Sequence, residues 1–191
     1  MTAPSTSEIV LVIGPKESGK SWLVKRGLGR VRRFVVWDVK GEYADARLGV
    51  LGARLWTSVR AWRQHLLDGG TIEREVFHCS GREFPAWCRW VAETGNLLVV
   101  IEELGRYCRG AVPPPYLDDL FNRSRHAPLD LICTTARPKR VFLDLRAQVD
   151  TAVVARMREP KDIAHLTEWL GEPAVARIQQ LEPLRFIRIR P

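Results

Sequence analysis

Short runs of Val, Ile and Leu alternate along this chain with longer segments in which apolar residues recur at helical spacing. The apolar runs predict strands at Glu8–Ile13, Arg33–Val39, Arg54–Trp56, Val76–Cys79, Leu97–Ile101, Leu129–Thr134, Thr151–Ala155 and Arg185–Arg188. Several runs are continuously apolar, which is typical of parallel strands covered on both faces. The segments between them predict helices at Lys20–Leu28, Val59–Leu67, Pro85–Glu93, Tyr116–Arg125, Lys161–Leu170 and Pro173–Leu181. This alternation predicts a three-layer α/β fold with a mostly parallel central sheet.

The length of 191 residues fits one domain, and we expect a single unit over residues 1–191. Its apolar runs are much shorter than the roughly 20 residues of a membrane-spanning helix. The N-terminal residues MTAPSTSE are polar and lack the basic-then-apolar pattern of a secretory signal. We therefore expect a soluble intracellular protein without a membrane span.

The net charge is +8, and 24 of the 30 basic residues are arginines. A basic surface attracts polyanions, and Arg binds phosphate through a planar fork of donors. An Arg-rich chain with few Asn and Gln also suits a GC-rich genome or a heat-adapted protein. Charge alone therefore leaves nucleic-acid binding open.

The cysteines, Cys79, Cys88, Cys108 and Cys133, form no C-x-x-C pair, and their spacing fits no zinc pattern. We expect free thiols in a reducing compartment.

The most specific motif is GPKESGKS, which matches G-x-x-x-x-G-K-[ST] between an apolar strand and a helical segment. In such a P-loop, backbone N–H groups surround phosphate oxygens and the next helix points its positive end at them. We expect Lys20 to contact the β- and γ-phosphates and Ser21 to bind Mg²⁺. The expected nucleotide-binding residues are Gly14, Pro15, Lys16, Glu17, Ser18, Gly19, Lys20, Ser21 and Trp22.

Two adjacent carboxylates, Glu102 and Glu103, follow the apolar run of NLLVVIEEL. Consecutive residues of a strand point to opposite faces, so the two side chains are expected to have different roles. We assign Glu102 to the Mg²⁺ site and Glu103 to the attacking water. A nucleotide kinase has no need of the second glutamate, because its nucleophile is the acceptor phosphate rather than water.

The segment FNRSRHAPLDLICTTARP places Arg125 just before a strand that ends in Thr134 and Thr135. A polar side chain at the tip of this strand can contact the γ-phosphate or the water. An arginine displayed before the strand can reach the nucleotide of a neighbouring subunit, where it would offset charge in the transition state. The alternative is that Arg125 is a solvent-exposed residue at the end of a helix and has no role at the nucleotide.

These segments resemble the FtsK–HerA superfamily of ring-forming, DNA-translocating ATPases from Ile9 to about Met157. VVWDVKGEY is similar to the Asp-x-x-Gly-Glu-Tyr signature of HerA-type proteins, and LVVIEEL is similar to their acidic strand. RHAPLDLICTTARP followed by LRAQVDTAVVARM is similar to the arginine, strand, Thr-Gln-Arg-Pro and next-strand sequence of the superfamily. The resemblance implies an ASCE, RecA-like P-loop NTPase fold, with ATP and Mg²⁺ as ligands. It gives Arg125 the trans-acting arginine position.

The chain departs from the superfamily pattern at two positions. Glu102 stands where Asp is usual, which makes the side chain one methylene longer. Ala136 stands where the sensor glutamine is usual, and its side chain forms no hydrogen bond. We therefore assign the sensor role to Thr135, with Thr134 as the alternative.

Within the superfamily, a motor of this size resembles the genome-packaging ATPases of tailless, membrane-containing icosahedral viruses. The resemblance implies a ring, expected to be a hexamer, that pumps double-stranded DNA regardless of its sequence. It also implies a partner at the viral capsid vertex or among inner-membrane proteins. The expected locations are the host cytoplasm during assembly and the vertex of the virion.

The segment GRYCRGAVPPPY is expected to be an irregular loop, because proline lacks the backbone donor. Loops on a rigid scaffold often carry function, although a plain connector fits the pattern nearly as well. Arg106 and Arg109 are our candidate DNA contacts on this loop. Four tryptophans, Trp22, Trp37, Trp87 and Trp90, are expected in the core rather than against DNA bases.

Other functions remain open at this stage. A host or plasmid relative that moves DNA in conjugation or repair fits the same motifs. A nucleotide kinase or another small P-loop enzyme fits the P-loop alone, and a scaffold that binds ATP without hydrolysis is disfavoured by Glu103.

Overall fold

The computed structural model describes residues 7–44, 49–109, 112–125 and 128–191. Its helices and strands in chain order are β1 (Ile9–Ile13), α1 (Lys20–Leu28), β2 (Phe34–Trp37), β3 (Arg54–Trp56), α2 (Val59–Leu67), β4 (Arg74–Phe77), α3 (Phe84–Thr94), β5 (Leu97–Ile101), α4 (Pro115–Ser124), β6 (Leu129–Thr135), α5 (Leu143–Arg146), β7 (Thr151–Ala155), α6 (Pro160–Leu170), α7 (Glu172–Gln179) and β8 (Phe186–Ile189). Three short 3-10 helices follow β4, β5 and β6: η1 (Gly81–Glu83), η2 (Leu104–Arg106) and η3 (Pro138–Arg140).

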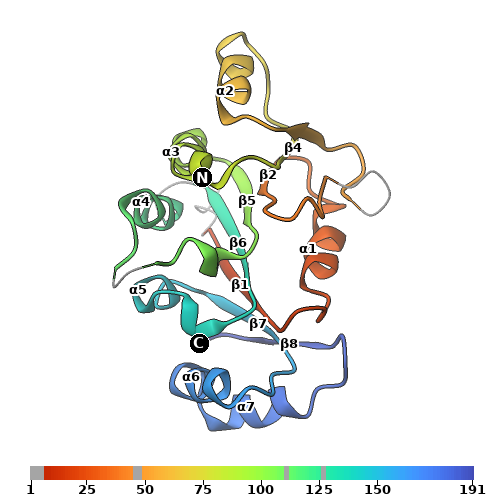
Figure 1. The fold of residues 1–191 in the computed structure, drawn as a ribbon, viewed down its shortest axis with the longest axis vertical. Coiled ribbons are helices and arrows are strands. Elements are labelled where there is room, and N and C mark those ends of the chain that lie inside the picture. Colours follow the sequence, from red (N-terminus) through yellow and green to blue (C-terminus); the bar gives the residue numbers. More distant parts are fainter. Residues whose placement is uncertain (1–6, 45–48, 110–111, 126–127) are drawn as a thin grey trace, which may run out of the picture.

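The described strands form one eight-stranded sheet in the order β3-β4-β2-β5-β6-β1-β7-β8. Neighbouring strands are parallel except β8, which runs antiparallel to β7 (Figure 1). The α/β fold with a mostly parallel sheet, as predicted from the sequence, is confirmed. One detail of this order matters for the site. Strand β6 lies between β1, which leads into the P-loop, and β5, which leads into the two glutamates.

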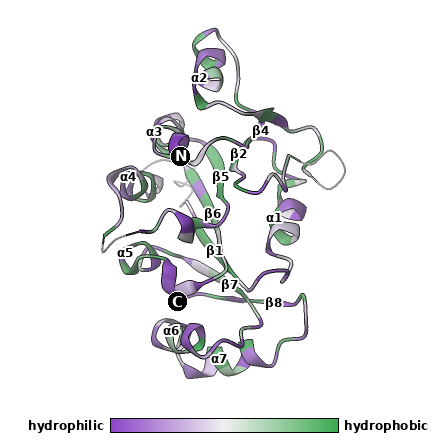
Figure 2. Ribbon diagram, viewed as in Figure 1, coloured by the Kyte–Doolittle hydropathy of each residue, from purple (hydrophilic) through white to green (hydrophobic). Residues whose placement is uncertain are grey.

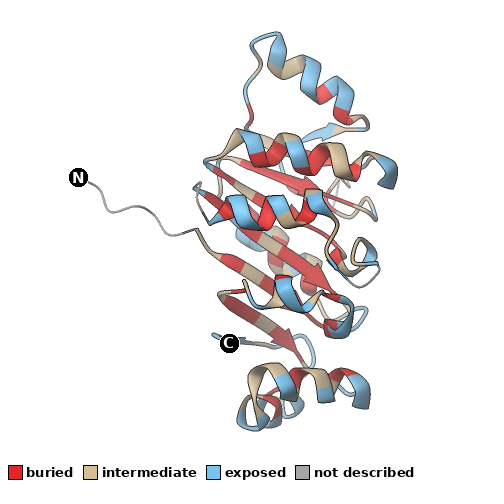
Figure 3. Ribbon diagram, turned by 90° about the vertical axis from the view of Figure 1, so that its left-hand side faces the viewer, coloured by how far each residue is buried: buried red, intermediate tan, exposed pale blue. Residues whose placement is uncertain are grey.

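Helices cover both faces of the sheet, which gives three layers (Figures 1 and 3). On one face, α1 packs Val24 and Leu28 against Val36 of β2 and Val100 of β5. On the other face, helices α2 to α7 contribute to a larger core. The buried residues of Figure 3 follow the strands, and the exposed ones follow the outer sides of the helices.

The larger core is rich in aromatic rings. The ring of Trp37 on β2 lies 5.2 Å from that of Phe84 and 5.3 Å from that of Trp87. Burying a large apolar side chain of this kind contributes roughly 1.5–3 kcal/mol of stability. The hydrophobic residues of Figure 2 accordingly concentrate on the central strands. The expected core positions of Trp37 and Trp87 are confirmed, and Trp90 is partly buried beside them.

The core position expected for Trp22 is wrong, because its side chain is 60% exposed. Helix α1 buries Lys20, Val24 and Leu28, which are spaced by four residues and share one side of the helix. Trp22 lies outside that stripe and faces solvent.

Several predicted bounds also differ. Strand β4 begins two residues earlier than expected. The polar Glu75 interrupts the apolar pattern in the sequence, but in the fold it is buried, and its carboxylate accepts a hydrogen bond of 2.5 Å from the Trp56 indole. Strand β2 ends at Trp37, because Asp38 begins a loop. Within the loop predicted over residues 105–116, η2 and the start of α4 are regular, and residues 110–111 lie outside the described part.

Candidate nucleotide site

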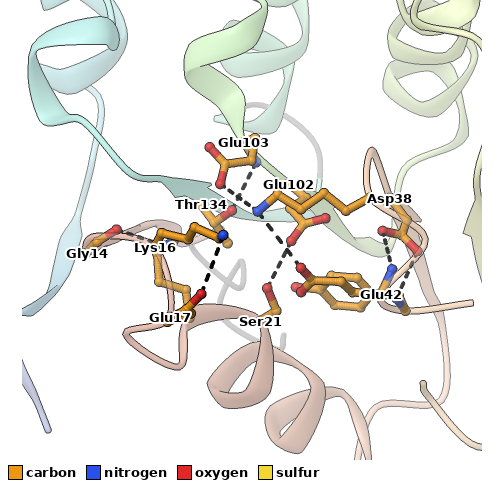
Figure 4. A network of polar contacts seen from close by, with 12 residues as sticks. Gly14, Lys16, Glu17, Ser21, Asp38, Glu42, Glu102, Glu103 and Thr134 are labelled. Atoms are coloured by element: carbon orange, nitrogen blue, oxygen red, sulfur yellow. Dashed lines mark hydrogen bonds and ion pairs between the residues drawn. The ribbon is translucent and has the colours of Figure 1, made fainter. Parts of the chain in front are cut away.

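The carboxyl ends of β1, β2, β5 and β6 meet at one edge of the sheet, because these strands are parallel. In open α/β sheets, ligands bind outside this edge. The residues that follow the four strands are the P-loop, Asp38, Glu102 with Glu103, and the end of β6 with Thr134. Figure 4 shows Ser21, Glu102, Glu103 and Thr134 close together at this edge, while Asp38 is bonded within its own loop.

The P-loop has the backbone geometry of a phosphate cradle. Glu17 and Gly19 have φ angles of 64° and 87°, in the left-handed region. A Cβ at Gly14 would lie 2.5 Å from Ser18 Oγ and 2.8 Å from Ala155 Cβ, so this position excludes a side chain. Helix α1 begins at Lys20, and no side chain caps its amino end. Its first N–H groups are therefore available to an anion.

Lys20 is buried and lies over the loop. Its Nζ donates to the carbonyl oxygens of Gly14 at 2.8 Å and Pro15 at 2.9 Å. Burial lowers the pKa of Lys20 below its ordinary value, while the charge of Glu103 acts in the opposite direction. Lys20 therefore lies in a partly desolvated position near the carboxylate of Glu103.

Ser21 and Glu102 are in direct contact. The Oγ of Ser21 donates to Oε1 of Glu102 at 2.9 Å, while Oε2 is buried without a hydrogen-bond partner among the described residues (Figure 4). Burial raises the pKa of Glu102 to about 7, and the hydrogen bond from Ser21 opposes that shift. A partly buried hydroxyl and a buried carboxylate oxygen without a partner are hard ligands of the kind that Mg²⁺ prefers. These residues fit the predicted metal site.

Glu103 lies beside Glu102 but has different partners. Its φ of 54° turns the chain from β5 into η2. Its backbone N–H donates to Thr134 Oγ1 at 3.0 Å, and its Oε1 accepts from Lys40 Nζ at 2.9 Å. The two glutamates therefore have different partners, Ser21 for Glu102 and Lys40 for Glu103.

Of the two threonines at the end of β6, Thr134 contacts the acidic turn. Thr135 Oγ1 instead bonds within its own turn, to the carbonyl and the N–H of Arg137 at 3.1 and 3.3 Å. Arg137 in turn pairs with Glu159 at 2.9 Å and with the buried Asp162 at 2.8 Å, so it anchors the start of α6. Thr134 is therefore better placed for a sensor contact than Thr135.

A cavity of about 830 Å³ lies over the P-loop. It is lined by Lys16, Glu17, Ser18, Gly19, Lys20, Ser21, Trp22, Lys25, Lys40, Glu42, Glu103, Arg106 and Arg140. Its volume is within the range of small-ligand sites, roughly 300–1,000 Å³. Six of its lining residues are lysines or arginines, which suits a polyanionic ligand.

A second cavity of about 620 Å³ adjoins the start of α1. Trp22 and Arg26 line one side, and the segment Pro183–Phe186 lines the other. The guanidinium of Arg26 lies 5.3 Å from the centre of the Trp22 ring, and Leu184 has a φ of 61°. Trp22 thus belongs to the rim of the site.

Arg125 lies at the opposite edge of the sheet. It follows α4, pairs with Asp150 at 2.9 Å and donates to the carbonyl of Gln148. Asp150 directly precedes β7, and Leu129 begins β6, so Arg125 is at the amino ends of the strands. Five strand residues span roughly 17 Å. The structure therefore does not bring Arg125 to the P-loop of its own chain.

Arg106 and Arg109 line a third cavity of about 620 Å³ at the same edge as the P-loop. Arg82 of η1 and Tyr116 of α4 also line it. Arg106 borders both this cavity and the one over the P-loop. Sequence reasoning did not identify Arg82, because η1 is distant from the loop in the sequence.

Sequence reasoning also assigned no role to Lys40, although it quoted the segment DVKGEY that contains it. The available signal was a basic residue in the loop after β2, a strand adjacent to β5 in the sheet. The four cysteines are free, as expected, and Cys88 and Cys133 are buried.

Among the described residues, no helix combines the length and apolar character that crossing a bilayer requires. A scan against protein-family models gave no match, and neither did a comparison of the sequence with curated proteins.

Solved structures do match this chain. The genome-packaging NTPase B204 from Sulfolobus turreted icosahedral virus 2, in complex with AMPPCP, superposes with a TM-score of 0.75 at 20% identity, over 96% of this chain and 97% of B204. The DNA-packaging ATPase B204 from Sulfolobus turreted icosahedral virus matches with a TM-score of 0.70 at 17% identity, over 96% and 97% of the two chains.

The pCW3 conjugation coupling protein TcpA, with ATPγS, matches with a TM-score of 0.57 at 17% identity, over 97% of this chain and 58% of TcpA. The resemblance seen in the sequence is thus confirmed at the level of the fold: the chain has the three-layer P-loop fold of genome-packaging and conjugation ATPases.

Proposed function

We propose that this protein is an ATP-driven translocase that packages double-stranded viral DNA into a preformed capsid. The observation that carries the proposal is the meeting of Lys20, Ser21, Glu102 and Glu103 at one edge of the sheet. A phosphate cradle, a metal-binding pair and a second carboxylate are the parts that hydrolysis of a triphosphate requires. The fold shared with B204 along nearly the whole of both chains supports packaging as the use of that hydrolysis.

Each residue has a separate part in the proposed reaction. The P-loop N–H groups and Lys20 bind the phosphates, and Trp22 lies against the nucleoside. Ser21 and Glu102 hold Mg²⁺, which when bound neutralises charge on the phosphates. Glu103 accepts a proton from the attacking water, and Thr134 or Thr135 orients the γ-phosphate or the water.

The proposal places ATP hydrolysis at subunit interfaces of a ring, expected to be a hexamer. The position of Arg125, at the sheet edge remote from its own P-loop, supports action on a neighbouring subunit. An arginine that acts in trans requires a head-to-tail interface, and such interfaces close into rings when the rotation allows. In that interface, the guanidinium of Arg125 would leave Asp150 and bind a phosphate of the neighbouring subunit's nucleotide.

For DNA, we propose Arg106 and Arg109 as contacts to the phosphate backbone, with Arg82 beside them. Backbone contacts carry no sequence information, which suits a packaging motor. The capsid vertex, or a protein of an inner membrane, is the proposed docking partner. The proposed locations are the host cytoplasm during assembly and the virion vertex.

The test is ATP turnover by the purified protein with and without long double-stranded DNA, combined with particle images of the same sample. We expect Mg²⁺-dependent hydrolysis that DNA stimulates, and ring-shaped particles. A protein that consumes no ATP under any of these conditions would overturn the proposal. A rate of ATP turnover that DNA leaves unchanged but a nucleoside monophosphate increases would instead indicate a nucleotide kinase.

A second candidate is a DNA-pumping ATPase of a host or a plasmid, favoured by the fold shared with the conjugation coupling protein TcpA. Both candidates predict DNA-stimulated hydrolysis. Binding to capsid proteins encoded beside the gene would support packaging, and binding to proteins of a conjugation apparatus would support the alternative.

A further inference from the structure

The loop after β2 is held in a fixed shape by Asp38. This carboxylate is 1% exposed and accepts hydrogen bonds from the backbone N–H groups of Glu42 at 3.1 Å, Tyr43 at 2.8 Å and Ala44 at 3.1 Å. Three backbone donors on one carboxylate fix the loop around it. Figure 4 shows Asp38 bonded to the loop rather than turned toward the P-loop.

Two further contacts define the turn that contains Lys40. Gly41 has a φ of 76°, and a Cβ there would lie 3.5 Å from the ring of His78. His78 Nδ1 lies 2.9 Å from the carbonyl oxygen of Asp38, and Lys25 Nζ donates to the carbonyl of Glu42 at 3.2 Å. The loop is therefore anchored to β4 and α1 on its two sides, and Lys40 lies at its centre.

Lys40 is directed by this loop to Glu103. Its Nζ lies 2.9 Å from Glu103 Oε1 and 3.9 Å from Glu42 Oε1. The side chain of Lys40 is 39% exposed, while that of Glu103 is 17% exposed, so the pair is partly shielded from solvent. Burial alone would lower the pKa of Lys40, yet its hydrogen bond to Glu103 and the surrounding carboxylates raise the pKa above its ordinary value.

We propose that Lys40 is a positioning residue for Glu103: it fixes the carboxylate through Oε1 so that Oε2 receives the proton of the attacking water. The inference rests on the proposed function in one respect, the role of Glu103 toward water. Glu103 stands in a left-handed backbone conformation after the strand, and its Oε1 accepts a hydrogen bond from Lys40. Lys40 supplies that contact from a loop that Asp38 keeps rigid.

The kinetic test is the replacement of Lys40 by Met, which keeps the length of the chain and removes the charge. We expect kcat for ATP to fall about 10- to 100-fold, a part of what a general base contributes, with KM changed less than about twofold. Lys40→Arg should recover part of the loss. Lys161→Met, on the exposed start of α6, is the matched control and should behave as the wild type.

A double-mutant cycle separates this role from a merely structural one. If Lys40 acts through Glu103, Lys40→Met in a Glu103→Gln background should cost no further activity. An additive loss would overturn the proposal. So would a raised KM with normal kcat, which indicates direct phosphate binding, or a raised kcat, which indicates that the pair inhibits the enzyme.

A second readout does not depend on hydrolysis. Without nucleotide, an amine-reactive acylating reagent should modify Lys40 slowly, and Glu103→Gln should accelerate that modification severalfold while Lys161 is unaffected. Equal rates in both proteins would overturn the pairing. A wild-type protein that turns over no ATP would overturn the proposed function, whatever the acylation result.

Discussion

Ser21 Oγ on α1 donates a hydrogen bond of 2.9 Å to Oε1 of Glu102, which follows β5, although β6 separates β5 from β1, the strand that leads into α1. The contact joins the first turn of α1 to the end of β5 across the tip of the intervening strand. Glu102 is 1% exposed, and burial raises its pKa to about 7. The hydrogen bond from Ser21 therefore offsets only part of the cost of burying this carboxylate in its ionised form.

This state predicts a pH-dependent stability. The pKa of Glu102 in the folded protein, about 7, exceeds its ordinary value of 4.5, so the folded state binds more protons between these values. The nucleotide-free protein should therefore lose stability as pH rises from about 4.5 through 7. Glu102→Gln should be more stable than the wild type by about 1–3 kcal/mol at pH 8, and by much less at pH 4.5.

Denaturant unfolding at both pH values, in the presence of a chelator, measures this difference. Glu93→Gln on the exposed side of α3 is the matched control and should show no pH-dependent difference. An equal effect of Glu102→Gln at both pH values would contradict a raised pKa of the buried Glu102 carboxylate.

Glu103→Gln and Lys20→Ala should separate hydrolysis from binding. The amide of Gln cannot accept the proton of water, so Glu103→Gln should lower kcat at least about 100-fold while ATP still binds. Lys20→Ala should weaken binding as well, because it removes a phosphate contact. Nucleotide binding by calorimetry and turnover of ATP check both variants. Normal turnover by Glu103→Gln would show that the carboxylate is misassigned.

Arg125 should act on a neighbouring chain. Arg125→Ala and Lys20→Ala should each be inactive alone, and a mixture should recover part of the activity because some interfaces then combine an intact P-loop with an intact arginine. Arg123 is an exposed residue in the last turn of α4, and the control variant Arg123→Ala should remain active. Failure of the mixture to recover activity, despite demonstrated co-assembly, would count against a shared site.

Trp22 should contribute to affinity rather than to chemistry. Its exposed ring borders the cavity beside Gly19, so Trp22→Ala should weaken ATP binding about 5- to 20-fold through loss of stacking. Trp22→Phe should retain most of the affinity. Binding titrations and saturation kinetics check this expectation, and a loss of kcat at saturating ATP would mean that the side chain has another role.

The cavity lined by Arg82, Arg106 and Arg109 predicts a salt-dependent interaction with DNA. Arg109→Ala should weaken binding to duplexes of unrelated sequence by a similar factor. It should also reduce the slope of log K against log salt by about 1. Arg177→Ala on α7 is a control that removes equal charge from another element. An unchanged slope for Arg109→Ala would exclude this residue as a phosphate contact.

The sequence predicted the parts of the fold that depend on local pattern. The bounds of α1, β5 and β7 are as expected, because each has an uninterrupted helical or apolar signature between clear breaks. Strand β4 was displaced because buried Glu75 depends on Trp56, a partner 19 residues away. Short α5 and the 3-10 helices carry too few residues to show a period.

The site was predictable where its residues are adjacent in a motif, and less so where the fold brings distant residues together. The P-loop and the two glutamates were identified directly. Lys40 was not assigned a role, because its contact with Glu103 joins residues 63 positions apart. The choice between Thr134 and Thr135 depended on which of the two side chains lies on the face of the sheet toward the turn after β5, and that depends on tertiary structure.

Glu103 and Arg106 belong to the same short turn, since the N–H of Arg106 donates to the carbonyl of Glu103 at 2.8 Å. The two residues are therefore linked by one backbone hydrogen bond within a single 3-10 turn. A partner that displaced the backbone of Arg106 would also displace the backbone of Glu103, so the proposed DNA contact and the proposed catalytic carboxylate belong to one structural unit.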